Sequence, residues 1–178
     1  MSNLSETQPD NLNQLNVVGF EINFSRLPAT TYFCQRINVP SVTLGETYQA
    51  NPFMNTPLEG DTLSFESLGI SFIVDEDMQN YIEIYNWLTA IGFPRDHTQF
   101  AALKTAEEFP EKTESLYSDI NIMLHTNKSN PNYKITFTDV FPTALSSVQL
   151  DSTPSTIDPI VVDASFNFRG QFDIEKII

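Results

Sequence analysis

Hydrophobic residues change their spacing within the segment from Leu63 to Ala90. Apolar side chains first occupy every second position, which is typical of a β-strand, and then recur every three or four positions, which is typical of an amphipathic helix. The strand positions are Phe65, Leu68, Ile70, Phe72 and Val74, and the helical positions are Met78, Tyr81, Ile82, Tyr85 and Leu88. Asp75 lies between the two patterns, in a position to cap the helix. The pattern predicts a long strand that runs directly into one helix at about residues 76–90.

The rest of the chain shows the two-residue period in several short segments. Strands are expected at Val18–Phe24, Tyr32–Val39, Val42–Tyr48, Ile120–Leu124, Tyr133–Phe137 and from about Ile160 to Phe172. The polar turn with Asn130-Pro131 predicts that the strands on either side of it form a hairpin. Leu27-Pro28 is expected to break the first strand. Residues 139–150, which include Pro142, are expected to connect the hairpin to the last strand.

These elements define the expected fold class. We expect a mainly β protein (β+α), an antiparallel β-sandwich or barrel with one flanking amphipathic helix. Of the 178 residues, 40% are hydrophobic, and the 14 Phe residues suit the alternate positions of buried strands. A chain of this length buries roughly 70% of its extended-chain surface in one compact domain. We therefore expect one β domain at residues 17–178, preceded by an N-terminal arm at residues 1–16.

Three segments lack a clear hydrophobic period. Residues 1–16 are polar and hold too little apolar surface to order alone, so this arm is expected to order on a partner. Residues 95–118 are mixed and charged, with a short helical turn expected at Ala101–Phe109. Residues 51–61 form an expected loop that carries Phe53, Met54 and Leu58, an unusual apolar load for a solvated segment. Either these side chains fold back on the domain's own core, or they meet a neighbouring subunit.

The charge of the chain narrows the choice of partners. It carries 23 acidic and 9 basic residues, a formal net charge of −14, and the basic residues are scattered singly. Proteins that hold nucleic acid or anionic lipid need clustered Lys and Arg, so tight binding to either is excluded. No apolar run approaches the roughly 18 residues of a membrane-spanning helix, and no secretory signal is visible. We therefore expect no membrane partner. The lone Cys34 has no partner for an internal disulfide, so we also expect production inside the cell.

Candidate catalytic and ligand-binding residues are few. The acids Asp75–Asp77 could hold a divalent cation, but three acids at the start of a helix are explained by capping and by the helix dipole. His97 and His125 lack the partners of a zinc site, and Cys34 is expected to be a small buried hydrophobe. The sequence contains neither a phosphate-binding glycine loop nor a serine-hydrolase elbow. We therefore expect no catalytic residue, no cofactor and no metal, and hence no enzyme.

The order of landmarks along nearly the whole chain resembles the tail tube proteins of contractile-tailed bacteriophages. The matching segments are an N-terminal arm with the strand Phe20–Phe24, Phe33-Cys34-Gln35 through Val39-Pro40, Phe53-Met54-Asn55 with Gly60-Asp61, Val74-Asp75-Glu76 before the helix, Trp87 within it, Phe141-Pro142-Thr143, Val148-Gln149-Leu150-Asp151 and a last strand of alternating aromatics. No one of these motifs is specific. Their shared order and spacing carry the resemblance.

The resemblance implies a structural function. It implies a subunit of a phage tail tube, in which hexameric rings stack head to tail around a channel for DNA passage into the host. Strands of neighbouring subunits would join into one continuous β-barrel, which removes the open sheet edges of a single copy. The implied partners are other copies of the chain, a tail sheath outside, and baseplate and neck or terminator proteins at the ends. DNA would pass without specific binding, and the protein would be made in the host cytoplasm and become part of the virion.

A second ring-forming role with the same fold stays open. The sequence has Val140-Phe141 where the family often has Leu-Trp, and Phe172-Asp173-Ile174 where the family has an aromatic cluster. The chain could therefore be a tube initiator or adaptor ring near the baseplate or neck. A tube subunit would polymerise into filaments, whereas an adaptor would stop at one ring.

The expected site residues are two sets of side chains at subunit contacts and at the channel wall. Phe53, Met54 and Leu58 are the expected subunit interface. Strand parity suggests Glu21, Glu46, Glu66 and Asp163 as acids that face the channel. There they would repel DNA phosphates over about 8 Å at physiological salt. The alternative is that these acids only solubilise the outer wall.

Overall fold

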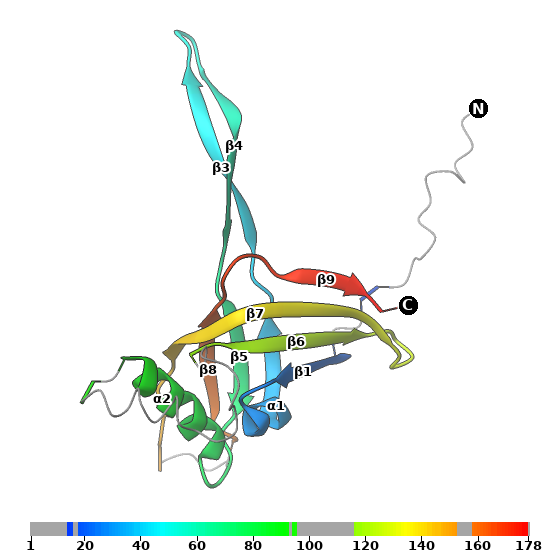
Figure 1. The fold of residues 1–178 in the computed structure, drawn as a ribbon, viewed down its shortest axis with the longest axis vertical. Helices are drawn as coiled ribbons and strands as arrows, with labels where there is room; N and C mark the ends of the chain where they lie inside the picture. The colour runs from blue at the N-terminus through cyan, green and yellow to red at the C-terminus, as the bar shows by residue number, and fades with distance from the viewer. Residues whose placement is uncertain (1–13, 16–17, 93, 96–115, 153–157, 178) are drawn as a thin grey trace.

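The computed structural model describes residues 14–15, 18–92, 94–95, 116–152 and 158–177, and Figure 1 shows their fold. The helices are α1 (Pro28–Phe33) and α2 (Gln79–Gly92). The strands are β1 (Phe20–Phe24), β2 (Cys34–Asn38), β3 (Val42–Ala50), β4 (Asn55–Phe65), β5 (Leu68–Ile73), β6 (Ser118–His125), β7 (Pro131–Leu145), β8 (Val161–Asn167) and β9 (Asp173–Lys176). Most of the expected arm, the expected turn at Ala101–Phe109 and His97 lie outside the described residues.

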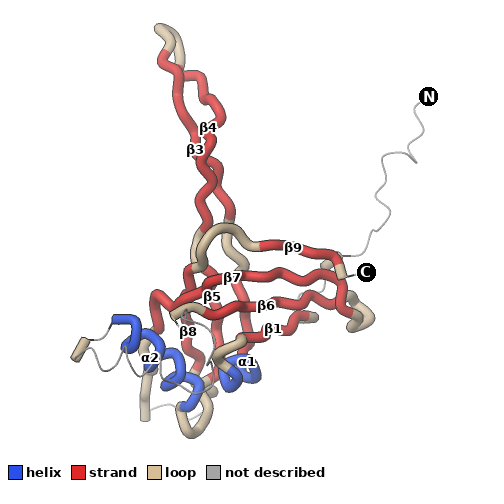
Figure 2. The backbone as a smooth tube through the Cα atoms, in the orientation of Figure 1, coloured by secondary structure: helices blue, strands red, loops and turns tan. Residues whose placement is uncertain are grey.

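Seven strands form one antiparallel sheet in two halves that share β7. The strand order is β1-β6-β7-β8-β5-β2, and β9 adds to β7. One half contains β1, β6, the first part of β7 and β9, while the other contains the last part of β7 with β8, β5 and β2. The strands of the two halves run in different directions and cross in Figure 2. The expected hairpin is confirmed, because β6 pairs with β7 in the register Ile122 to Ile135.

The hydrophobic core is built from alternate residues of both halves and from α2. In β5 and β8 the buried positions alternate with less buried ones, as a half-buried strand requires. The largest fully buried side chains are Phe72, Phe137 and Phe166. Trp87 of α2 is 2% exposed, and its ring centroid lies 6.2 Å from that of Phe166. The helix therefore closes one side of the same core (Figure 1).

The start of α2 differs from the expectation in its cap. The prediction that Asp75 caps the helix is wrong, because the helix begins four residues later, at Gln79. The Oδ1 atom of Asp75 is buried and has no hydrogen-bond partner. The fully buried Asn80 organises this turn instead. Its Nδ2 donates to the Ile73 carbonyl oxygen at 2.7 Å, and its Oδ1 accepts from the Tyr81 amide at 2.8 Å. One side chain thus joins the end of β5 to the first turn of α2.

The buried face of α2 also differs from the expected one. Ile84, Trp87 and Ala90 are buried, and Tyr81 and Leu88 pack against them. Met78, Ile82 and Tyr85, which the periodic pattern placed with the core, are 37%, 46% and 52% exposed. The sequence carries two apolar stripes at helical spacing, and spacing alone does not tell which stripe faces the core.

Several expected strand boundaries are wrong for local reasons. Tyr32 and Phe33 belong to α1 and not to a strand, because Pro28 suits a first helical turn and the Thr31 hydroxyl donates to the Leu27 carbonyl at 3.1 Å. β7 continues through Pro142 to Leu145, with an irregularity between Pro142 and Ala144 that accommodates the missing donor.

The last expected strand is divided into two strands. β8 ends at Asn167 and β9 begins at Asp173, with Gly170 at a φ of 81° between them. That left-handed conformation favours glycine and lets the chain turn from one half of the sheet to the other. Phe65 likewise belongs to β4, so the expected long strand before α2 consists of β5 alone.

The segment expected to be a loop at residues 51–61 is mostly strand. β4 begins at Asn55 and pairs with β3 as a separate two-stranded sheet, so only residues 51–54 form the turn. This hairpin projects away from the larger sheet in Figures 1 and 2. Within the described residues, neither helix is long and apolar enough to cross a membrane.

Candidate assembly interface

The hairpin of β3 and β4, here called the ribbon (residues 42–65), is largely exposed. Every residue of β3 is exposed. At its tip, the Asn51 amide donates to the Met54 carbonyl oxygen at 3.2 Å, and Asn51 Nδ2 donates to Thr56 Oγ1 at 3.2 Å. An isolated two-stranded hairpin is only marginally stable in water. The ribbon therefore needs a further surface to pack against.

The expected interface residues all lie on this ribbon and are exposed. Phe53, Met54 and Leu58 are 98%, 65% and 43% exposed. The interpretation that they fold back on the domain's own core is therefore wrong. Other large apolar side chains along the same ribbon are also exposed, and sequence analysis did not assign them: Val42, Leu44, Tyr48 and Leu63. Their alternate positions along the strand were the signal in the sequence that could have identified them.

The ribbon is acidic as well as apolar. Between residues 42 and 65 it carries Glu46, Glu59 and Asp61 and contains no Lys or Arg. Glu46 lies directly opposite Glu59 in the ladder, an arrangement of like charges that destabilises a strand pair. The Tyr48 hydroxyl donates to Glu46 Oε2 at 2.9 Å and partly compensates. A surface that receives the ribbon would gain from carrying a cation.

Two glycines allow the strands of the ribbon to approach closely. The register shifts between Leu44 and Glu46, beside Gly45. A Cβ atom added to Gly60 would lie 2.4 Å from the Gly45 carbonyl oxygen, too close for any side chain. A Cβ atom added to Gly45 would meet only the Thr62 carbonyl oxygen, at an ordinary 3.4 Å. Of the two glycines, Gly60 is thus the one that the ribbon requires.

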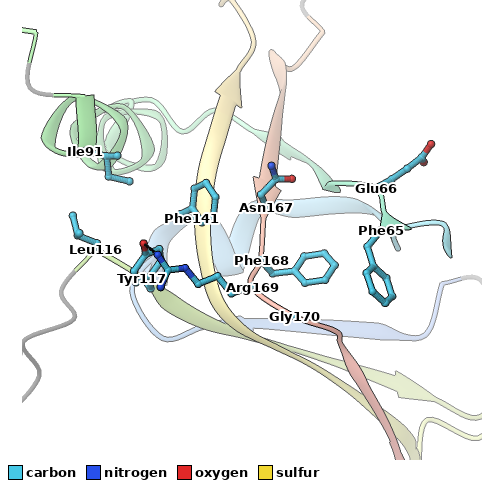
Figure 3. Close-up of a pocket in the computed structure, with 10 residues that line it drawn as sticks. All are labelled: Phe65, Glu66, Ile91, Leu116, Tyr117, Phe141, Asn167, Phe168, Arg169 and Gly170. Carbon is cyan, nitrogen blue, oxygen red and sulfur yellow. Dashed lines mark hydrogen bonds between the residues drawn. The ribbon is translucent and has the colours of Figure 1, made fainter. Parts of the chain in front are cut away.

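A pocket of about 490 Å³ lies where the ribbon joins the larger sheet (Figure 3). Half-buried apolar residues form its wall: Phe65, Ile91, Leu116, Tyr117, Phe141 and Phe168. Several of their rings meet edge to face, with centroids of Phe65 and Phe168 5.9 Å apart and those of Tyr117 and Phe141 also 5.9 Å apart. Glu66, Asn167, Arg169 and Gly170 complete the lining. We call this site the aromatic pocket.

Arg169 places one positive charge in the aromatic pocket. Its guanidinium carbon lies 4.2 Å from the ring centroid of Tyr117, and its Nη2 donates to the Tyr117 hydroxyl oxygen. A guanidinium held over a ring keeps further N–H groups available for an acceptor. Figure 3 shows both side chains toward the same side of the pocket. Sequence analysis did not single out Arg169, because the contact joins residues 52 positions apart.

The outward face of the β1-β6-β7-β9 half is polar. In an antiparallel ladder, opposed residues share a face, so the pairs Glu21 with Met123, Met123 with Lys134 and Lys134 with Glu175 form one row across the four strands. The neighbouring row contains Asn23, Asn121, Thr136 and Asp173, and the Thr136 hydroxyl donates to Asn121 Oδ1 at 3.2 Å. The face carries more acids than bases.

The structure does not bring the four expected channel acids together. Glu21 lies on the polar face just described, while Glu46 lies on the ribbon and Glu66 lines the aromatic pocket. Asp163 lies on β8 in the other half, where its Oδ1 accepts from the Ser71 hydroxyl at 2.6 Å. All four are exposed. Asp173 and Glu175 join Glu21 instead, and β9 was hidden from sequence analysis because it was merged with β8.

Both outer strands of that half have an edge without a described strand neighbour. Within the described residues, β1 pairs only with β6, and β9 pairs only with β7. Val18 beside β1 is 84% exposed, and Ile174 of β9 is 59% exposed although it pairs with the buried Ile135. Unpaired strand edges are templates for a further strand. These edges, the ribbon and the aromatic pocket are the surfaces that fit contact with another chain.

The other candidate residues give no sign of a reactive site. Burial raises the pKa of the Cys34 thiol to about 11, so it is largely protonated at neutral pH, and its Sγ donates to the Arg36 carbonyl at 3.6 Å. Among the described residues, no group of three or more His, Cys, Asp or Glu could hold a metal ion.

Comparison with known proteins gives one curated relative and several solved structures. No family model matches the chain. The tail tube terminator protein of Enterobacteria phage T4 is 24% identical over 179 residues, which cover 97% of this chain and 96% of that protein. The resemblance to tail tube proteins is confirmed. The proteins that this chain resembles are structural proteins of tails or tubes and not enzymes.

Solved structures confirm the tail-tube-like fold. The tube-terminating cap of the anti-feeding prophage matches with a TM-score of 0.59 at 13% identity, over 99% of both chains. The sheath-tube complex of an extracellular contractile injection system matches with a TM-score of 0.53 at 12% identity, over 92% of this chain and 93% of that one. The 6-fold symmetrised baseplate of the anti-feeding prophage matches with a TM-score of 0.53 at 14% identity, over 88% and 90%. The expected antiparallel β fold with a flanking helix is thus shared by a cap, a sheath-tube complex and a baseplate.

Proposed function

We propose that this chain forms a ring that terminates the tube of a contractile tail. The observation that carries the proposal is the end-to-end similarity to the tail tube terminator of phage T4. The tube-terminating cap of the anti-feeding prophage shares the fold over 99% of both chains, which agrees with the same choice. Sequence analysis favoured the repeated tube subunit and kept an adaptor ring as its alternative. The repeated subunit remains the second candidate, because a sheath-tube complex has a similar fold.

Ring closure through the edges of the β1-β6-β7-β9 half would complete the molecule. β1 and β7 run in one direction, and β6 and β9 run in the other. In a ring with rotational symmetry, β9 of one copy would therefore lie antiparallel to β1 of the next copy. This contact would cover Ile174 and remove both open edges. Six copies are proposed on the resemblance, in agreement with the 6-fold symmetrised baseplate of similar fold.

The polar face of the same half would line the channel. Glu21, Asp173 and Glu175 would then face the DNA, and their charge would oppose phosphate binding within about 8 Å. DNA would pass without being held, which suits a conduit for ejection. Glu46, Glu66 and Asp163 would not lie on this wall, because they lie on the ribbon, in the aromatic pocket and on the other half of the sheet.

The remaining surfaces would serve the other tail components. The ribbon, with Phe53, Met54 and Leu58, would bind an adjacent subunit or ring. A sheath or its terminator would lie outside, and neck proteins would follow at the end of the tube. The protein would be made in the host cytoplasm and be part of the virion.

Electron microscopy of the purified chain tests the proposal. A terminator should form single rings at high concentration, and adding it to growing tubes should stop their elongation. Long filaments of the chain alone would refute termination and favour the repeated subunit. A stable single particle, alone and with tube protein, would refute both roles. The variant Glu175→Lys, on the polar face, serves as the channel control, because it should leave rings intact and slow DNA ejection.

A further inference from the structure

We propose that the ribbon tip of one copy, with Phe53, occupies the aromatic pocket of an adjacent copy of the same chain. The inference rests on the proposed function, since it specifies how neighbouring subunits of a ring recognise one another. It assigns the aromatic pocket to protein binding and names the side chain that enters it.

The tip and the pocket are complementary in size and polarity. Phe53 is 98% exposed, so nearly its whole ring is available for burial. The pocket of about 490 Å³ has space for this ring together with part of Met54, and its wall consists largely of ring edges and aliphatic groups. Aromatic pairs favour the edge-to-face arrangements that Phe65, Phe141 and Phe168 already adopt around it.

The charges of the tip and of the pocket are compatible with a copy of this chain as the occupant. The pocket lining carries one acid and one base, Glu66 and Arg169, and the Arg169 guanidinium is held in place by Tyr117. The tip residues 49–56 carry no charge that would have to be buried. The acids Glu46 and Glu59 lie behind the tip and would stay outside the filled pocket.

The dimensions fit a contact between neighbours. Nine residues of β3 span about 30 Å at about 3.4 Å per residue, and a domain of this size has a radius of gyration of about 16 Å. The tip therefore lies about one subunit away from the pocket at its own base (Figure 1). A tip-to-pocket contact joins two different surfaces, and such heterologous contacts generate a ring when the rotation closes.

Paired cysteines with a short bis-maleimide crosslinker test the contact. In a Cys34→Ser background that keeps Phe53, one chain carries Met54→Cys at the tip and a second chain carries Asn167→Cys in the pocket. Either chain alone should give no crosslinked dimer, a mixture should give a dimer, and a chain with both changes should give a ladder that ends at the closed ring. The control target is Leu150→Cys, because Leu150 is 83% exposed and lies with the residues at the opposite end of β8.

The outcomes separate this inference from the proposed function. Dimer yield with Asn167→Cys should exceed that with Leu150→Cys by roughly tenfold or more, since burial of a Phe ring favours a contact about ten- to a hundredfold. Equal yields would overturn the inference. If the yields are equal but Phe53→Ser still prevents tube capping, the tip binds the tube protein. In that case the proposed termination is supported, and the contact between copies is refuted. If Phe53→Ser affects neither ring formation nor capping, the tip has no role in assembly and the inference also falls.

Discussion

Replacing Gly60 by Ala should open the ribbon without unfolding the rest of the protein. A Cβ atom at this position would lie 2.4 Å from the Gly45 carbonyl oxygen and 2.7 Å from its carbon, well inside the 3.0 Å below which such contacts are essentially never found. Backbone atoms form the obstacle, so no side chain can rotate away to relieve it. The two strands must separate locally.

The expected cost follows from the measured cost of overpacking. Forcing an extra methyl group into a tight contact costs typically about 1–3 kcal/mol, which corresponds to roughly a 5- to 150-fold larger population of the open ribbon. Because β3 and β4 form a sheet of their own, this cost should be confined to the ribbon. The body should keep its melting temperature, whereas the assembly that depends on an ordered ribbon should weaken.

Amide hydrogen exchange on the unassembled chain measures the effect directly. Gly60→Ala should speed the exchange of amides between residues 46 and 59 by the same factor and leave those of β5 to β8 unchanged. Gly45→Ala is the matched control, since its Cβ atom meets the Thr62 carbonyl at an ordinary 3.4 Å. If amide exchange in the Gly60→Ala ribbon is unchanged and rings form as before, the ribbon does not require a glycine at position 60, and the reasoning is refuted.

Three further predictions concern the body of the protein. Asn80→Ala should lower the free energy of unfolding by about 1–3 kcal/mol in urea titrations, because the Ile73 carbonyl and the Tyr81 amide lose a buried partner; Asn86→Ala, on the exposed side of the helix, is the control. Trp87→Phe should cost about 1–2 kcal/mol by the same measurement, since the indole donates to the Leu116 carbonyl at 3.0 Å, and a loss within error would contradict this. The Cys34 thiol, with its pKa raised to about 11 by burial, should react with a disulfide reagent far more slowly at pH 8 than the same thiol in urea. Since this pKa is raised in the folded state, the stability linked to it is fully present below pH 9 and is lost as the pH rises toward about 11.

The sequence pattern predicted those strands and helices in which the local preferences of the residues agree with their tertiary contacts. Alternating residues such as Ile120 and Ile122 are buried in β6, and the hairpin with β7 has the predicted turn. The pattern failed where a tertiary contact decides the outcome. α2 buries Trp87 and not Ile82, although both lie on apolar stripes, because the choice depends on Phe166 and its neighbours across the core.

In the candidate site, too, the sequence predicted what local patterns show and missed what tertiary contacts decide. Phe53, Met54 and Leu58 were found because apolar residues in a turn-rich segment are conspicuous, and they are exposed in the structure. The four acids expected at the channel do not lie on one face, since parity within one strand does not reveal which half of the sheet the strand joins. The aromatic pocket could not be predicted, because it gathers residues of β4, α2, β7 and the turn after β8, which the sequence separates widely.

The shared strand β7 has a mechanical consequence for any assembly. Its first part pairs with β6 and β9, and its last part pairs with β8, so a single covalent segment of 15 residues belongs to both halves of the sheet. Strain applied at the outer strand β9 passes to β7 and then along peptide bonds, which do not yield as hydrogen bonds do. Pulling on one half should therefore displace the other half with it, and each subunit should transmit torque as a stiff body.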